Sequence, residues 1–300
     1  MNASRAFLDP AVLGRLLALP VHARQAMLGS VSGKHRSPVR GSSLEFAQYR
    51  KYVPGDDTRR LDWRTWARND RFYIKEFEAD TNLRLCLLID TSGSMGFGSK
   101  GQTRLDYARK LAATLGYLAS KQGDAVGLWS LAQNRIELPP RRGATHLGLV
   151  LDHMSQLKPV GGTTLLDALH DAAERISQRA LIVILSDFFV PVPELKKAVQ
   201  HLRYRRHDVT AFHLLDQQEL EFPFDRPARF LDMEGGDAVL VDPTLIAANY
   251  RLAVASYLKD IDTLVRTTGI DYQRITLQER YDDALAKFLL SRMPKRRTRS

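Results

Sequence analysis

From residue 83 onward, segments typical of strands and segments typical of helices alternate along this chain of 300 residues. Short apolar runs such as LCLLI and ALIVIL are separated by longer stretches in which apolar residues recur every three or four positions, as on one face of a helix. Strands that alternate with helices at this spacing are joined by crossover connections and lie parallel to one another. The pattern predicts an α/β fold with a doubly wound, mostly parallel sheet, Rossmann-like in class.

The expected elements follow one another in a regular order. We expect strands at residues 83–90, 124–131, 134–140, 180–187, 208–216 and 270–277, and helices at residues 103–123, 147–157, 161–177, 193–203, 244–267 and 282–291. Thr103 and Asp106 have the spacing of a capping box at the start of the first of these helices. Pro139 and Pro140 are expected to close the short third strand.

Two stretches depart from this order. Between residues 213 and 244, the sequence RFLDMEGGDAVLVDP predicts a small hairpin insertion that turns at Gly235 and Gly236. In residues 1–80, Asp9 and Pro10 can start a short helix, and RFYIKEFEAD alternates like a strand that joins or caps the sheet. We therefore divide the chain into an N-terminal segment 1–80, an α/β domain 81–292 and a basic tail 293–300.

Composition narrows the classes of protein. The chain contains no run of about 18 apolar residues and no signal-peptide pattern, so neither a membrane span nor secretion is expected. A single cysteine, Cys86, in an apolar run fits a cytoplasmic protein. The net charge of +10 is concentrated at the two ends, and we interpret the basic tail as a solvated end rather than as a contact with nucleic acid.

Three loops carry oxygen-bearing side chains to the same region of the predicted fold. They are the loop 90–94 (DTSGS) after the first strand, the loop 161–164 (GGTT) before a helix, and Ser186 with Asp187 at the end of ALIVILSD. Ligands of doubly wound sheets gather at the carboxyl ends of the strands. Carboxylates and hydroxyls without Cys or His suit Mg²⁺ or Mn²⁺, and an incomplete shell leaves a position for an acidic side chain of a partner protein.

This combination resembles the metal-ion-dependent adhesion site of von Willebrand factor A domains, and the resemblance extends in element order over roughly residues 83–290. It implies a von Willebrand factor A-like fold and a magnesium-dependent binding site. Ser92 and Ser94 would bind the metal directly, and Thr163 directly or through water. Asp90 and Asp187 would bind it through water or directly, depending on state.

The segment SLEFAQYRKYVPGDDTRRLDWRTWARNDRFYIKEFE is similar to the signature of the bacterial domain-of-unknown-function 58 family, in which it precedes an A-type domain. Members are typically encoded beside MoxR-type AAA+ ATPases, which implies such an ATPase as partner and a role in the assembly or maturation of other proteins. The segment also carries three aspartates and three arginines, which we interpret as ion pairs rather than as a second metal site: Asp56, Asp57, Asp62, Arg59, Arg60 and Arg64.

The main alternative to a binding module is a metal-dependent phosphoester hydrolase or phosphotransferase with Asp90 as nucleophile. That chemistry usually needs a second acid close to the nucleophile, and Ser92 stands at the corresponding position. The stretch GFGSKG matches G-x-G-x-x-G, but it begins too far after its strand for a dinucleotide site. In the absence of a metal, Asp90, Ser92 and Ser94 would serve only as helix caps. We predict a non-enzymatic protein without catalytic residues.

Overall fold

The computed structural model describes residues 7–23, 44–51, 65, 72–79, 83–99, 101–131, 135–162, 164–236 and 238–293. Contacts divide the chain into two compact units, one of residues 1–25 with 83–300 and one of residues 26–82. The predicted ligand Thr163, the acidic and basic cluster at residues 56–64 and most of the predicted tail lie outside the described residues.

The larger unit is built on a six-stranded sheet with the strand order β10-β7-β6-β3-β4-β5. Its strands are β3 (Arg84–Ile89), β4 (Ala125–Ser130), β5 (Glu137–Arg141), β6 (Leu181–Ser186), β7 (Asp208–Leu215) and β10 (Asp271–Thr276). Neighbouring strands are parallel except β5, which runs antiparallel to β4. Strands β4, β6 and β7 are buried along their whole length, which explains their continuous apolar character. The predicted mostly parallel sheet is confirmed.

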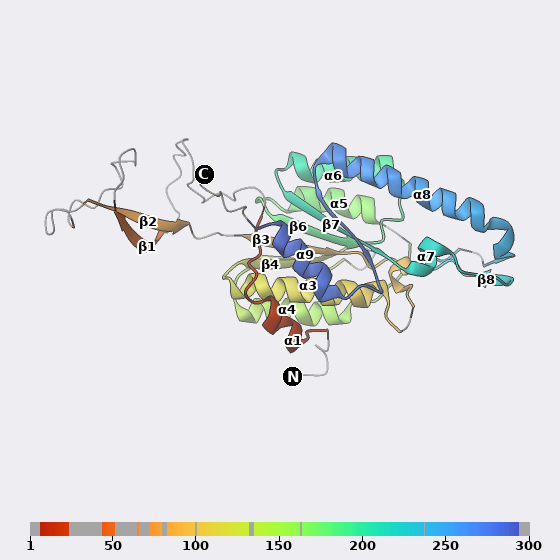
Figure 1. The fold of residues 1–300 in the computed structure, drawn as a ribbon, viewed down its shortest axis with the longest axis horizontal. Helices are drawn as coiled ribbons and strands as arrows, with labels where there is room; N and C mark the ends of the chain where they lie inside the picture. Colours follow the sequence, from red (N-terminus) through yellow and green to blue (C-terminus); the bar gives the residue numbers. More distant parts are fainter. Residues whose placement is uncertain are drawn as a thin grey trace. The chain divides into compact units, whose positions relative to one another are not determined.

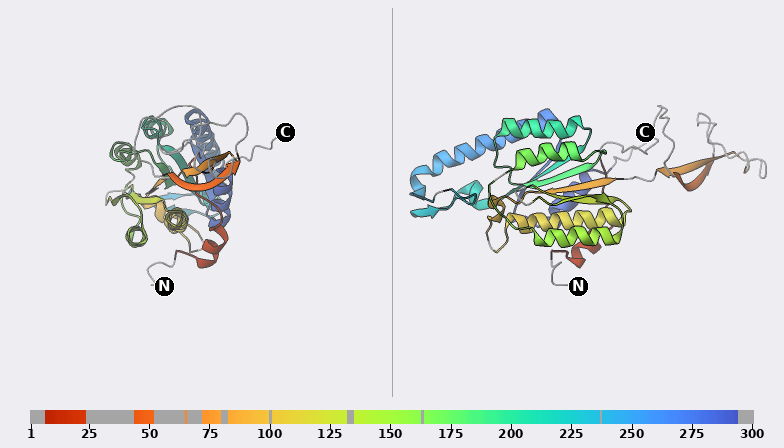
Figure 2. Two further views of the ribbon diagram at one scale, coloured as in Figure 1. Left: turned by 90° about the vertical axis from the view of Figure 1, so that its left-hand side faces the viewer. Right: turned by 180° about the vertical axis from the view of Figure 1, so that it is seen from behind.

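Helices cover both faces of this sheet (Figures 1 and 2). On one face lie α3 (Arg104–Lys121), α4 (Ala144–Gln156) and α9 (Tyr281–Ser291), and on the other lie α5 (Leu165–Arg175), α6 (Val192–Tyr204) and α8 (Pro243–Thr268). Alternate residues of each strand serve the two faces: Cys86 and Leu88 pack in the core beneath α5 and α6, whereas Leu87 lies against α3. The capping box of Thr103 and Asp106 forms as predicted.

Strand β5 differs from its prediction because Pro139 and Pro140 lie inside it. An edge strand tolerates proline, since its outer side needs no hydrogen-bond donor. The neighbouring β4 contains Gly127 at an irregularity in the pairing, where an added Cβ would lie 2.6 Å from the carbonyl oxygen of Leu138. The prolines therefore shape the edge of the sheet instead of ending the strand.

The first described residues form α1 (Pro10–Leu16), which begins at Asp9 as predicted and packs against α3 and α9. In the smaller unit, β1 (Leu44–Lys51) and β2 (Tyr73–Ala79) form a separate antiparallel pair. Residues 71–80 were expected to form a strand that joins or caps the main sheet. The strand is present as β2, but joining the main sheet is wrong, because β2 pairs with β1, a strand that we did not predict.

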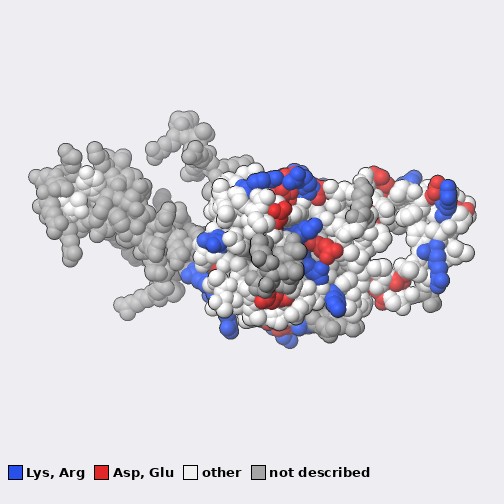
Figure 3. Space-filling view, turned by 90° about the horizontal axis from the view of Figure 1, so that it is seen from below, with Lys and Arg blue, Asp and Glu red and all other residues white. Residues whose placement is uncertain are grey.

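The predicted hairpin insertion is present in the larger unit as β8 (Ala228–Phe230) and β9 (Val239–Val241). Together with the short helix α7 (Gln217–Glu221) and the first half of α8, it lies beyond the carboxyl ends of the sheet strands (Figures 1 and 2). No helix in the described part of the chain combines the length and the apolar character needed to cross a membrane. On the face shown in Figure 3, basic and acidic side chains of this unit are interspersed.

Candidate metal site

Asp90 and Asp187 follow the neighbouring parallel strands β3 and β6, so the fold brings the two carboxylates to the same edge of the sheet. Both are almost fully buried, with exposed fractions of 1% and 2%. The carboxylate of Asp90 accepts a hydrogen bond from the hydroxyl of Ser186 at 2.6 Å and another from the backbone N–H of Ser92 at 2.9 Å. These bonds hold the carboxylate in place, and a carboxylate oxygen can accept more than one partner.

The loop after Asp90 brings the two predicted serine ligands together. Ser92 precedes a turn of 3₁₀ helix at Gly93–Gly96, and the hydroxyl oxygens of Ser92 and Ser94 lie 3.1 Å apart. The second predicted loop lies beside the first, because the N–H of Gly93 donates to the carbonyl of Gly161 at 2.9 Å. The two loops therefore meet as expected, although the position of Thr163 itself stays a prediction.

The charges of this site favour a cation. Burial raises the pKa of Asp90 to about 6, and repulsion from Asp187 acts in the same direction. A positive ion beside the two carboxylates would relieve that repulsion. Within the described residues, no cluster of three or more His, Cys, Asp or Glu side chains could hold a metal ion. The predicted site has two aspartates and would rely on hydroxyl oxygens for its other ligands. Its donors are oxygens, which fit Mg²⁺ or Mn²⁺.

Sequence reasoning missed Arg104, the first residue of α3, whose exposed fraction is only 1%. Its guanidinium donates to the carboxylate of Asp187 at 2.9 Å and to the carbonyl of Ser94 at 2.8 Å. It also forms an ion pair with Glu219 of α7. The sequence did contain one indication of this role. A basic residue in the first turn of a helix interacts unfavourably with the helix dipole, so its presence there indicates a specific partner.

A cavity of about 340 Å³ opens beside Ser94. Its lining includes Arg104, Glu219 and the hairpin residues 231–234. The hairpin approaches closely enough that a Cβ on Gly93 would lie 1.9 Å from the carbonyl oxygen of Met233. Among the candidate ligands, Ser94 therefore lines a space that the hairpin helps to form.

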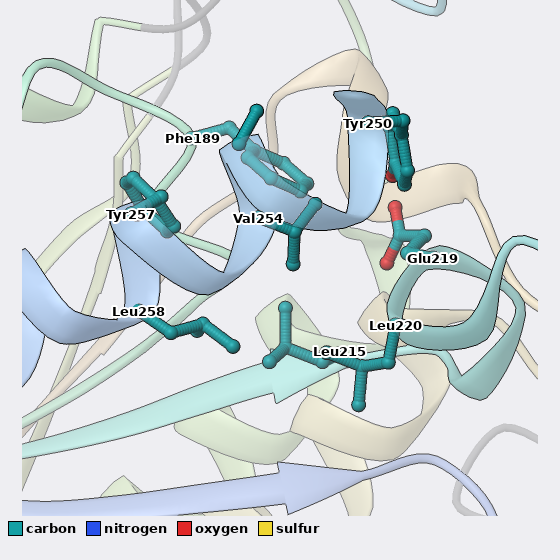
Figure 4. Close-up of a pocket in the computed structure, with 9 residues that line it drawn as sticks. Phe189, Leu215, Glu219, Leu220, Tyr250, Val254, Tyr257 and Leu258 are labelled. Atoms are coloured by element: carbon teal, nitrogen blue, oxygen red, sulfur yellow. The ribbon is translucent and has the colours of Figure 1, made fainter. Parts of the chain in front are cut away.

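A second cavity, of about 210 Å³, lies between α8, α7 and the end of β7. In Figure 4, Val254 and Leu258 of α8 point toward Leu215 at the end of β7, and Glu219 lies beside Tyr250. Its lining is almost entirely apolar apart from Glu219, which also lines the cavity beside Ser94. An apolar space thus adjoins the cavity beside Ser94.

The fold and these loops define an α/β protein with a candidate site for a hard cation at the carboxyl edge of its sheet. A family model described as "Protein of unknown function DUF58" matches residues 48–259, which is more than half of the chain. The chain belongs to this family, as the sequence signature predicted.

Known proteins similar to this chain include one close in length. An uncharacterized protein of Mycobacterium tuberculosis is 28% identical over 292 residues, covering 95% of this chain and 90% of that protein. Among solved structures, an aerotolerance-related membrane protein from Bacteroides fragilis is 15% identical, with 70% of this chain and 100% of that chain covered and a TM-score of 0.46. The SpRpn10 VWA domain is 15% identical, with coverages of 69% and 94% and a TM-score of 0.42.

Proposed function

We propose that this protein is a metal-dependent protein-binding module that acts with a MoxR-type AAA+ ATPase in the assembly or maturation of other proteins. The observation that carries the proposal is the group of oxygens at the ends of β3 and β6, where two buried carboxylates adjoin the paired hydroxyls of Ser92 and Ser94. Mg²⁺ or Mn²⁺ held by this group, with Thr163 as a further ligand, would retain a position for an acidic side chain of the partner.

Exposed apolar side chains on α8 and the hairpin support a protein partner. Leu245 and Leu252 are spaced by seven residues on the first half of α8 and are 79% and 70% exposed. Leu240, on the hairpin, is 76% exposed. Large apolar side chains exposed on one face of a helix and on an adjoining hairpin are typical of surfaces that bind other proteins.

The metal assignment is tested by thermal unfolding. Mg²⁺ is expected to raise the melting temperature of the wild type but not that of Asp90→Ala or Ser94→Ala, because a ligand stabilises only a folded state that binds it. Ser155→Ala removes a hydroxyl from α4 instead and should respond like the wild type. Equal shifts in all four proteins would contradict a site at Asp90 and Ser94.

The partner assignment is tested by capture of a purified MoxR-type ATPase on the immobilised protein, with Mg²⁺ or with EDTA. Capture should require Mg²⁺ and should be lost in Ser94→Ala. Capture that is equal in EDTA would remove the metal from the mechanism. Hydrolysis of a generic phosphoester that is lost in Asp90→Asn would instead favour an enzyme.

A further inference from the structure

Arg104 brings a permanent positive charge to the candidate metal ligands. One of its guanidinium nitrogens, Nη1, donates both to Asp187 at 2.9 Å and to the carbonyl of Ser94 at 2.8 Å. Asp187 is therefore already bound by a cation that the chain itself supplies. A divalent metal and this guanidinium would use the same carboxylate, and in a buried site two positive charges so close repel strongly.

Arg104 has a second anchor that does not depend on Asp187. Its other terminal nitrogen, Nη2, pairs with Glu219, and that carboxylate is fixed because it also accepts the backbone N–H of Asp216 at 3.1 Å in the capping box of α7. The rings of Phe97 and Phe189 lie 5.2 Å and 5.4 Å from the guanidinium carbon. The guanidinium thus has partners that can hold it when it gives up Asp187.

We infer that Arg104 is a built-in competitor of the metal: it and the cation compete for Asp187, and metal binding requires Arg104 to release Asp187 while it keeps its ion pair with Glu219. The inference rests on the metal site of the proposed function. As a consequence, the protein binds the metal more weakly than the same oxygen ligands would without Arg104. Binding of the metal is also coupled to α7, because Glu219 then remains the carboxylate partner of the guanidinium.

Direct metal titration of the purified protein tests the inference. Binding of Mn²⁺ is measured from the electron paramagnetic resonance signal of the free ion, and binding of Mg²⁺ by calorimetry. Arg104→Gln removes the competing charge and should tighten the Mn²⁺ dissociation constant by about tenfold or more. Glu219→Gln removes the second anchor and should weaken binding.

Matched variants separate this competition from a general change in charge. Lys110→Gln removes a positive charge from the same helix, and Glu221→Gln removes a negative charge from α7 without touching Arg104. Lys110→Gln should change the Mn²⁺ dissociation constant less than Arg104→Gln does, and Glu221→Gln less than Glu219→Gln does. Adding Ser94→Ala to Arg104→Gln should abolish the tight binding, which shows that the ion occupies the candidate site.

The double variant Arg104→Gln/Glu219→Gln keeps the net charge of the protein. It replaces Arg104→Gln in the titration if circular dichroism shows that Arg104→Gln alone does not fold. It too should bind Mn²⁺ more tightly than the wild type. If neither variant binds more tightly than Lys110→Gln, the inference is wrong. If the ATPase is captured equally with Mg²⁺ and with EDTA, the proposed function is contradicted, but tighter Mn²⁺ binding by Arg104→Gln would still support the inference. Failure of the proposed function and failure of the inference are therefore distinguishable.

Discussion

His207 is a buried histidine just before β7, and its Nδ1 accepts the backbone N–H of Ala180 at 3.2 Å. Burial lowers the pKa of His207 from 6.5 to about 4, and repulsion from Arg205 and Arg179 contributes. Between these two pH values the unfolded chain binds a proton that the folded chain does not. The free energy of unfolding should therefore fall as the pH drops from 6.5 toward 4, by up to about 1.4 kcal/mol per pH unit from this group.

Urea unfolding at pH 7, 6 and 5 measures this dependence. In His207→Asn the amide oxygen can still accept the hydrogen bond but does not titrate, so stability should fall less steeply with decreasing pH. The control is His153→Asn, on α4, which should follow the wild type. Parallel pH profiles for wild type and His207→Asn would contradict the prediction.

The candidate site shows which residues a sequence can indicate. Asp90, Ser92 and Ser94 share one short loop, and Asp187 ends an apolar run, so strand ends and residue types suffice to group them. Glu219 could not be grouped with them, because only the folded chain brings α7 against Arg104. Local motifs were predictable, and the ion pair that crosses between elements was not.

Helix α3 carries Arg104 to the site, and the capping box at its start fixes where it begins. The hydroxyl of Thr103 accepts the N–H of Asp106 at 3.1 Å, and the Asp106 carboxylate accepts the N–H of Thr103 at 3.2 Å. Thr103→Ala should lower the free energy of unfolding by about 1 kcal/mol, because it leaves a donor of the first turn unpaired. Thermal unfolding measures the loss, and Thr103→Ser, which keeps the hydroxyl, should restore most of it.

At the level of elements, the regular alternation after residue 83 was sufficient to predict each strand of the main sheet. The central strands were the clearest, because buried parallel strands have continuous apolar runs. The prediction was wrong where the structure depends on which strands pair with each other. Pro139 and Pro140 were expected to end a strand, but they lie within one because β5 is at the edge of the sheet. The partner of β2 was missed for the same reason, since no local pattern specifies which strands pair.

Arg292 follows the last helix and connects three distant parts of the larger unit. Its guanidinium donates to Asp208, at the start of β7, at 3.0 Å, and to Asp271, at the start of β10, at 2.6 Å. It also donates to the backbone carbonyl of His22 at 2.7 Å. The side chain is fully buried, so one cation near the end of the described chain joins two strands and the segment after α1.

Replacing Arg292 by Met keeps much of the volume but removes the positive charge that Asp208 and Asp271 share. Buried carboxylates that lose their cation are costly, so the free energy of unfolding should fall by about 3–5 kcal/mol in urea titrations at pH 7. The matched control is Arg175→Met, which breaks an ion pair with Glu137 in which the arginine is 57% exposed and should cost less than about 1 kcal/mol. Equal losses in the two variants would mean that the network at Arg292 contributes no more than a surface pair. A larger loss for Arg292→Met would mean that packing of α9 and of the residues near His22 onto the sheet depends on this one buried charge.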